Sequence, residues 1–182
     1  MNIGCCRGVL LCAFQKMGAV AHGLERPELE IAPAIPNIVK TGAITDAAYI
    51  NQYFDLVVLR HALEHLHNNL QHIQHLGEHP REAGILVLSV PSIESLQRRL
   101  FRRLRFHLDV PRHLLQKESS WLLSTLMQQG YTIEAVQYFD FTQNIFGFAQ
   151  SAMNVIAPQR ANEFYRLLKQ GRRGAMESHL QR

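Results

Sequence analysis

The stretch "MNIGCCRGVLLCAFQKMGAVAHGLE", residues 1–25, has the outline of a nucleotide-binding strand–loop–helix–strand unit. Gly4 and Gly8 lie in the turn after a short first strand, and Glu25 ends the next apolar run. Glycines in such a turn let backbone amides approach a ligand without a Cβ in the way, and a carboxylate at the next strand end accepts hydrogen bonds from two ribose hydroxyls. By itself the pattern is a weak signal, because G-x-x-x-G turns are common.

The rest of the chain continues the alternation of apolar runs and helical patterns. Strands are expected at 18–25, 53–59, 84–91 and 131–139, and helices at about 8–17, 62–79 and 117–129. Short continuous apolar runs suit strands that are buried on both faces of a parallel sheet. Strand–helix–strand repetition therefore predicts an α/β sandwich with right-handed crossovers.

The helix expected at 62–79 can be tested by its phase. At about 100° per residue, leucine and isoleucine side chains fall on one side and histidines on the other. The first group is Leu63, Leu66, Leu70, Ile73 and Leu76, and the second is His61, His65, His72, His75 and His79. We expect the apolar group to face the sheet and most of the histidines to form a solvated face.

Length and composition favour one globular domain. The chain has 182 residues, of which 47% are hydrophobic and 19% charged, an ordinary balance for a folded protein. It lacks a secretory signal and an apolar run of the ~20 residues that span a bilayer, so a cytoplasmic location is expected. Cys5, Cys6 and Cys12 form no C-x-x-C pair, and free, buried thiols are expected rather than a zinc site.

The positive charge is concentrated in one segment. The net charge is +4, and six arginines between residues 98 and 112 are opposed only by Asp109. Such a segment attracts phosphates, nucleic acid or an anionic membrane surface, or it forms a solvated helix face.

Three further stretches make the resemblance specific. "FDLVVLRHALEHLHNNL" (54–70), "AGILVLSVPS" (83–92) and "FHLDVPRHL" (106–114) follow the first unit in the order found in class I S-adenosylmethionine-dependent methyltransferases. The chain resembles the small-molecule branch of that family over about residues 1–155. The resemblance implies a Rossmann-like open, mostly parallel sheet sandwiched by helices, with a shortened first strand, no good apolar run for the last strand, and truncation at both ends. Residues 96–115 would form a substrate lid within a 1–155 domain, and 156–182 a basic helical tail.

The resemblance also assigns roles around the cofactor S-adenosylmethionine. Asn2, Gly4, Cys6 and Gly8 would lie at the glycine loop. Glu25 would hold the ribose and Arg26 would flank the adenine. Ala43 and Ile44 would lie by the adenine edge, and Leu59 and Arg60 would pass beneath the sulfonium.

Methyl transfer is an in-line displacement, which requires aligned reactants and often a proton acceptor. His61, His65 and His113 are the candidate bases, because a histidine titrates near working pH, and Glu64 would orient one of them. Arg112 and His113 would contact the substrate or brace their loop. The expected acceptor is a small-molecule or lipid-like, anionic compound, with peripheral membrane contact through the basic segment. No aromatic-interleaved basic surface supports nucleic-acid binding.

Two alternatives stay open. Asn2 stands where the family has an acid and Cys6 where it has a glycine, and these departures, with the short ends, are typical of a catalytically silent remnant of the fold. His61 to His65 also fits the H-x-x-E-H pattern of inverted zinc peptidases. This is the weakest reading, because the motif follows a strand directly and no pattern supplies a third ligand.

Overall fold

The computed structural model describes residues 1–27, 36–43, 52–66, 69–76, 80–108 and 117–157. The chain divides into two compact units. Unit 1 consists of residues 1–92 and 114–133, and unit 2 of residues 93–113 and 134–182. The domain boundary expected at residue 155 stays a prediction.

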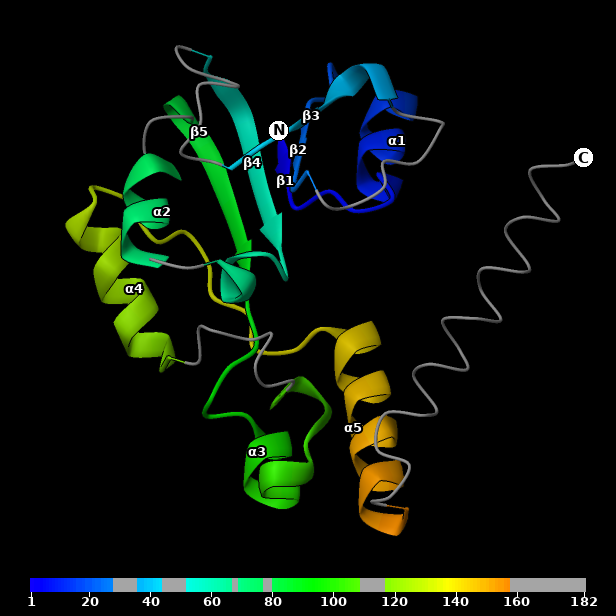
Figure 1. Ribbon diagram of the computed structural model, residues 1–182. Coiled ribbons are helices and arrows are strands. Elements are labelled where there is room, and N and C mark those ends of the chain that lie inside the picture. Colours follow the sequence, from blue (N-terminus) through cyan, green and yellow to red (C-terminus); the bar gives the residue numbers. More distant parts are fainter. Residues whose placement is uncertain (28–35, 44–51, 67–68, 77–79, 109–116, 158–182) are drawn as a thin grey trace, which may run out of the picture. The chain divides into compact units, whose positions relative to one another are not determined.

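Unit 1 is built on a five-stranded sheet in which every pair of neighbouring strands is parallel (Figure 1). Its strands are β1 (Asn2–Ile3), β2 (Gly23–Glu25), β3 (Val39–Thr41), β4 (Phe54–Arg60) and β5 (Pro80–Ser89), in the order β3-β2-β1-β4-β5. Ile3 pairs with Leu24 on one side and with Leu59 on the other. The predicted α/β fold with an open parallel sheet is therefore confirmed. All five strands end at the same edge of the sheet.

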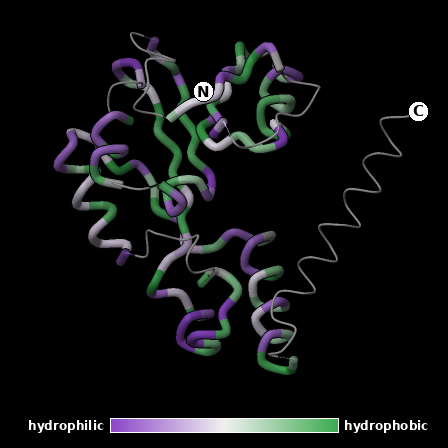
Figure 2. Tube along the Cα trace, in the orientation of Figure 1, coloured by the Kyte–Doolittle hydropathy of each residue, from purple (hydrophilic) through white to green (hydrophobic). Residues whose placement is uncertain are grey.

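Helices cover this sheet through two hydrophobic clusters. The larger cluster joins Val57 and Leu59 of β4 to Ile73 of α2 (Asn69–Leu76) and Leu126 of α4 (Ser119–Gln128). The smaller cluster joins Leu11 of α1 (Val9–Lys16) to Cys5, Ala21 and Val39, with the turn η1 (Pro36–Ile38) beside it. Figure 2 shows hydrophobic residues along most of β4 and along the second half of β5.

The prediction of one continuous helix over 62–79 is wrong. Leu63–His65 form a single 3₁₀ turn (η3), Leu66 is extended, and α2 begins only at Asn69. The helical phase counted from residue 62 therefore does not by itself predict which side chains of α2 are buried. Leu63, Ile73 and Leu76 are fully buried as expected, but Leu70 is 50% exposed, and His72 and His75 are partly buried rather than solvated.

The strand expected at 131–139 is also wrong, because residues 131–140 form no regular element. Tyr131 and Ile133 pack against the larger cluster, whereas Tyr138 and Phe139 are mostly exposed. The chain passes from unit 1 to unit 2 after Ile133, so this apolar segment is divided between the two units.

Two other strands differ from expectation. The strand expected at 18–25 starts only at Gly23, because the chain leaves α1 through a turn at Met17 and Gly18. The strand expected at 84–91 is not buried on both faces, since β5 is an edge strand with Ile85 and Val87 exposed. β3 had no predicted counterpart.

Unit 2 packs a short basic segment against one long helix. The segment contains α3 (Leu96–Phe101) and the 3₁₀ turns η4 (Arg102–Leu104) and η5 (Phe106–Leu108), and the helix is α5 (Phe141–Ile156). Aromatic pairs join the two, with Phe101 against Phe148 and Phe106 against Phe146. Among the described residues no helix is long and apolar enough to cross a bilayer.

Candidate functional site

The turn after β1 takes a shape that favours glycine at both ends. Gly4 and Gly8 have φ angles of 70° and 69°, a region that residues with a Cβ adopt only with strain. The Gly4 N–H donates to the Leu24 carbonyl at 2.9 Å, and the Gly8 N–H donates to the Cys5 carbonyl at 2.8 Å. Gly8 then caps α1. The backbone of residues 4–8 is thus fixed between β1, β2 and the first turn of the helix.

Gly4 also makes a close approach that any larger residue would prevent. A Cβ built at Gly4 would lie 2.6 Å from the Cβ of Ala62, in the segment that follows β4. The loops after β1 and β4 therefore meet at the carboxyl edge of two adjacent strands. In an open parallel sheet this is where the strand order reverses and where ligands bind.

Glu25 ends β2 beside this turn. Its carboxylate accepts from the Cys6 N–H at 2.6 Å through one oxygen and from the Arg26 N–H at 2.9 Å through the other. Glu25 is only 4% exposed, and the Gly42 N–H donates to its carbonyl at 2.9 Å. The ends of β1, β2 and β3 are therefore tied together around one residue, through both the side chain and the backbone carbonyl of Glu25.

The three cysteines do not share one environment. Cys6, with a φ of 48°, is exposed, and so is Arg7, so neither side chain is packed inside the turn. Cys12 is partly buried, and Cys5 is buried. Burial, together with the nearby negative charge of Glu25, raises the pKa of the Cys5 thiol to about 12. The expectation of free and buried thiols is thus wrong for Cys6, which lies on the surface of the loop.

A second cluster forms at the ends of β4 and β5. His61 follows β4 with a φ of 53°, and its N–H donates to the Ser89 carbonyl at 2.8 Å. Its Nδ1 lies 3.2 Å from Oε1 of Glu64, and its Nε2 lies 3.4 Å from Oγ of Ser89. Glu64 is fully buried, and within the described part of the chain its Oε2 has no hydrogen-bond partner. The imidazole is thus oriented by a buried carboxylate and a hydroxyl.

Ser89 was not predicted from the sequence. It is the last residue of β5 and pairs in register with Arg60, so it ends at the same edge as His61. The signal that could have found it is a polar residue at the carboxyl end of an apolar strand.

The structure places the other predicted residues as follows. Asn2 is buried in β1, Leu59 is fully buried in β4, Arg60 is exposed at the end of that strand, Arg26 and Ala43 are exposed, and His65 lies in η3. Ile44, Arg112 and His113 lie outside the described residues. The structure brings together Gly4, Cys6, Gly8 and Glu25, and separately His61 and Glu64. Their roles stay predictions.

The local structure does not match the metal-binding pattern of a peptidase. His61 precedes the 3₁₀ turn that contains Glu64 and His65, so the two histidines do not share a helix face as that motif requires. Within the described part of the chain no three His, Cys, Asp or Glu side chains gather in a way that could hold a metal ion.

Comparison with known proteins supports the architecture. The YcgJ protein from Bacillus subtilis has a similar solved structure, with a TM-score of 0.58 and 17% sequence identity. The match covers 75% of this chain and 62% of that one, so the chain spans less than two thirds of the neighbour's length. At this identity the likeness concerns the fold alone. A search of curated proteins gave no significant match.

A family model identifies the family of the chain, which the structural neighbour does not. The model is described as a methyltransferase domain, and it matches residues 1–136. That range contains the turn of residues 4–8, Glu25 and the His61–Glu64 pair. With most of its length matched, this chain belongs to the methyltransferase-domain family.

Proposed function

We propose that this chain binds S-adenosylmethionine at the turn of residues 4–8 and transfers its methyl group to a small-molecule or lipid-like acceptor. The observation that carries the proposal is the buried Glu25 carboxylate, held against the turn by the Cys6 N–H at 2.6 Å. Family membership supports methyl transfer in general. The cofactor and the acceptor are the parts we add.

The residues present fit an adenosyl group. A carboxylate has about four acceptor positions, and its two hydrogen bonds to Cys6 and Arg26 occupy one on each oxygen. Glu25 therefore keeps capacity for two ribose hydroxyls. Gly4 and Gly8 put no side chain at the two ends of the turn, where the backbone takes positive φ angles. We place the adenine by Arg26 and Ala43, which are exposed beyond the ends of β2 and β3.

When bound, S-adenosylmethionine supplies a methyl carbon that the adjacent sulfonium makes electrophilic. His61 is our candidate for the group that accepts the proton of the methyl acceptor. If Nδ1–H donates to Glu64, the imidazole is left with Nε2 as its basic atom. His65 and His113 remain alternatives for this role, and Arg112 a candidate contact to the acceptor.

Cofactor binding is tested by calorimetric titration of the full chain with S-adenosylhomocysteine. Replacing Glu25 by Gln should weaken binding by about 10- to 100-fold, since a hydrogen bond to a charged group contributes roughly 1.5–3 kcal/mol. Glu134→Gln is the matched control, because Glu134 is an exposed acid outside the site and should bind as the parent does. Thermal unfolding of each variant checks that it is folded.

The alternative of a silent remnant has its own outcome in this experiment. A folded parent chain that shows no heat of binding at millimolar S-adenosylhomocysteine would replace our proposal with that alternative. A parent that binds, with a Glu25→Gln variant that binds equally well, would keep the cofactor but refute the site.

Transfer is tested separately from binding. The chain is incubated with a cell extract and S-adenosylmethionine that carries a labelled methyl group, and label is measured in solvent-extractable, protein and nucleic-acid fractions. We expect label in the solvent-extractable fraction. Label confined to nucleic acid would contradict the acceptor class.

A variant at His61 then examines proton transfer. Asn tolerates a positive φ better than most residues, so His61→Asn should preserve the backbone after β4 and the affinity for S-adenosylhomocysteine. We expect labelling to fall by about 10²-fold or more, the usual contribution of a positioned base. Unchanged labelling would remove His61 from the mechanism.

A further inference from the structure

The basic segment of unit 2 exposes arginines and leucines side by side. Arg98, Arg99, Arg102 and Arg103 are all exposed. Leu96 and Leu100, one helical turn apart, are 56% and 59% exposed. No acidic residue occurs between residues 95 and 108. The segment therefore presents concentrated positive charge together with aliphatic side chains that water solvates poorly.

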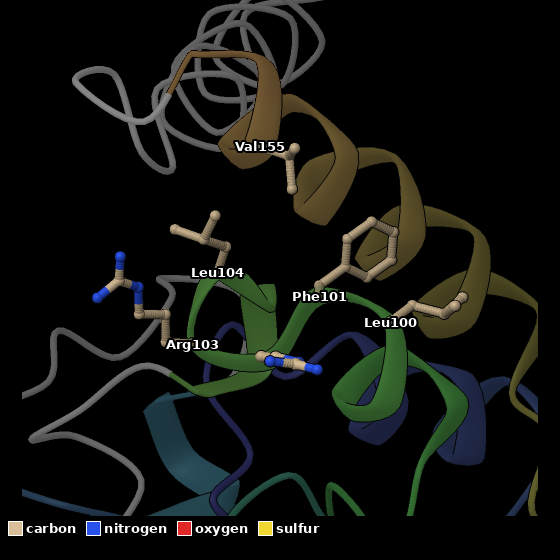
Figure 3. Close-up of a pocket in the computed structure, with 6 residues that line it drawn as sticks. Leu100, Phe101, Arg103, Leu104 and Val155 are labelled. Carbon is tan, nitrogen blue, oxygen red and sulfur yellow. The ribbon is translucent and has the colours of Figure 1, made fainter.

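The end of α5 extends this surface. A hollow of about 490 Å³ lies between the segment and α5, lined by Leu100, Phe101, Arg102, Arg103, Leu104 and Val155. In Figure 3, Phe101, Leu104 and Val155 surround the hollow and Arg103 lies at its side. Val155 and Ile156 are 50% and 76% exposed. We call the exposed arginines and leucines of residues 96–104, with Val155 and Ile156, the arginine–leucine surface.

Buried polar side chains fix the two parts of this surface to each other. The Asn154 side chain donates to the Leu104 carbonyl at 3.1 Å, and the Phe106 N–H donates to Oγ of Ser151 at 2.9 Å. Both Ser151 and Asn154 are buried, at 0% and 4% exposure. Each bond is partly buried and has a buried side chain at one end. The surface is therefore held in shape by unit 2 itself.

We propose that the arginine–leucine surface docks onto an anionic membrane. Guanidinium groups bind lipid phosphates, and each basic side chain near an anionic bilayer adds to the attraction. Exposed leucine, valine and isoleucine side chains gain by entering the boundary between headgroups and acyl chains. An anionic membrane thus accounts for both the exposed arginines and the exposed aliphatic side chains of the surface. The proposal does not depend on methyl transfer.

Two other occupants explain only half of the surface. Nucleic acid would satisfy the arginines, but it would leave the aliphatic side chains against a phosphate backbone, where they gain nothing. A second copy of the chain would cover the leucines, but it would bring two sets of four arginines together, and like charges repel. The membrane is therefore the occupant that charge and hydrophobicity favour jointly.

The test is sedimentation of the full chain with vesicles of phosphatidylcholine, with and without phosphatidylserine. We expect binding only to the anionic vesicles, and weaker binding at high salt because exposed charges are screened. Arg99→Gln with Arg103→Gln should lower partitioning by about thirty-fold, from the usual attraction per basic residue. Lys16→Gln with Lys117→Gln removes the same charge from exposed lysines elsewhere and should lower it far less.

Two further variants make the result specific. Arg99→Lys with Arg103→Lys keeps the charge and should retain most of the binding, which also guards against loss of fold in the Gln variant. Leu96→Ser with Leu100→Ser should weaken binding to anionic vesicles while leaving the retention of the chain on a heparin column unchanged.

Several outcomes would overturn the proposal. These are equal binding to neutral and anionic vesicles, no binding to either, and equal losses in the arginine and lysine variants. A concentration-dependent dimer that Leu100→Ser abolishes would instead assign the surface to a second copy. Binding of a nucleic acid that Leu96→Ser and Leu100→Ser leave intact, without vesicle binding, would assign it to that partner.

Discussion

Replacing Gly4 by Ala should destabilise unit 1 through two separable effects. The φ of 70° at Gly4 costs a residue with a Cβ roughly 1–2 kcal/mol. The added carbon would also lie 2.6 Å from the Cβ of Ala62, about 1 Å inside the usual contact distance of two carbons. Overpacking of this kind costs roughly 1–3 kcal/mol. The expected total is about 2–5 kcal/mol, a large part of the ~5–15 kcal/mol that stabilises a typical domain.

Two other glycines in the chain isolate the backbone contribution. Gly18 and Gly130 have φ angles of 82° and 86°, and a Cβ built at either position meets nothing within 4 Å. Gly18→Ala and Gly130→Ala should therefore cost only about 1–2 kcal/mol each. The difference between these variants and Gly4→Ala measures the steric part. Urea denaturation gives all three values, provided that the slope with denaturant stays constant.

A double-mutant cycle with Ala62 identifies the atom responsible. Ala62→Gly alone should cost roughly 1 kcal/mol, since it removes a buried methyl group. In the Gly4→Ala background the same change removes the overlap, because the next atom, Cα of Ala62, would lie at an ordinary 3.7 Å. The double variant should be more stable than the sum of the single effects by about 1–3 kcal/mol. A Gly4→Ala cost no greater than that of Gly18→Ala, or a coupling near zero, would refute the contact between the loops after β1 and β4.

Three other predictions test the surroundings of the site. Tyr131→Phe should raise stability by about 1 kcal/mol, because the buried Tyr131 hydroxyl meets no hydrogen-bond partner among the residues that the structure describes. A loss of stability in urea would show that the hydroxyl is satisfied. Burial, with the nearby charge of Lys40 as a lesser contribution, lowers the pKa of His22, so the unfolded chain binds the proton more readily and stability should fall as pH drops below about 6.5. His22→Gln should flatten this dependence in urea titrations between about pH 7 and 5, and an unchanged slope would contradict it. Ser151→Ala should cost about 1–3 kcal/mol, since it removes the hydroxyl that accepts the hydrogen bond from the Phe106 N–H, and thermal unfolding would detect the change.

The turn of residues 4–8 and the acid at the end of β2 could be predicted from the sequence, because the constraints on them are mainly local. A turn that needs positive φ at two positions selects Gly4 and Gly8, and a strand that ends beside it places Glu25. The contact between Gly4 and Ala62 is long-range, but the positive φ selects glycine at this position without it. The parallel sheet followed from the alternation of elements for the same reason.

The segment after β4 could not be read in this way. His61 takes a left-handed conformation, and its N–H donates to the carbonyl of Ser89, 28 residues away in the chain. That tertiary contact breaks the helical pattern before α2 begins. The hydrophobic periodicity of the sequence does not reveal this contact, because the apolar spacing of Leu63, Ile73 and Leu76 is the same whether or not the helix is continuous.

The prediction of a strand over 131–139 is wrong for a different reason. Its alternating apolar residues fit a strand, but a strand exists only where a neighbour accepts its backbone hydrogen bonds. Tyr131 and Ile133 find the core, whereas Val136 and Tyr138 remain exposed. The hydrophobic pattern indicates that a segment favours the strand conformation, but it does not show whether a neighbouring strand is available to pair with it.

A protein that binds the cofactor without catalysing a reaction would need only one of the two parts of the candidate site. Glu25 and its turn serve ligand binding whether or not a reaction follows, so they fit a silent remnant as well as an enzyme. Glu64 is different, because it is fully buried and one of its oxygens has no hydrogen-bond partner among the described residues. A buried unsatisfied polar group costs roughly 1–3 kcal/mol. A structural role would be served better by an apolar side chain of similar size. Its contact with the strained His61 gives that cost a physical reason if the imidazole must be oriented to accept a proton. The Glu64–His61 pair therefore favours an active transferase over a remnant.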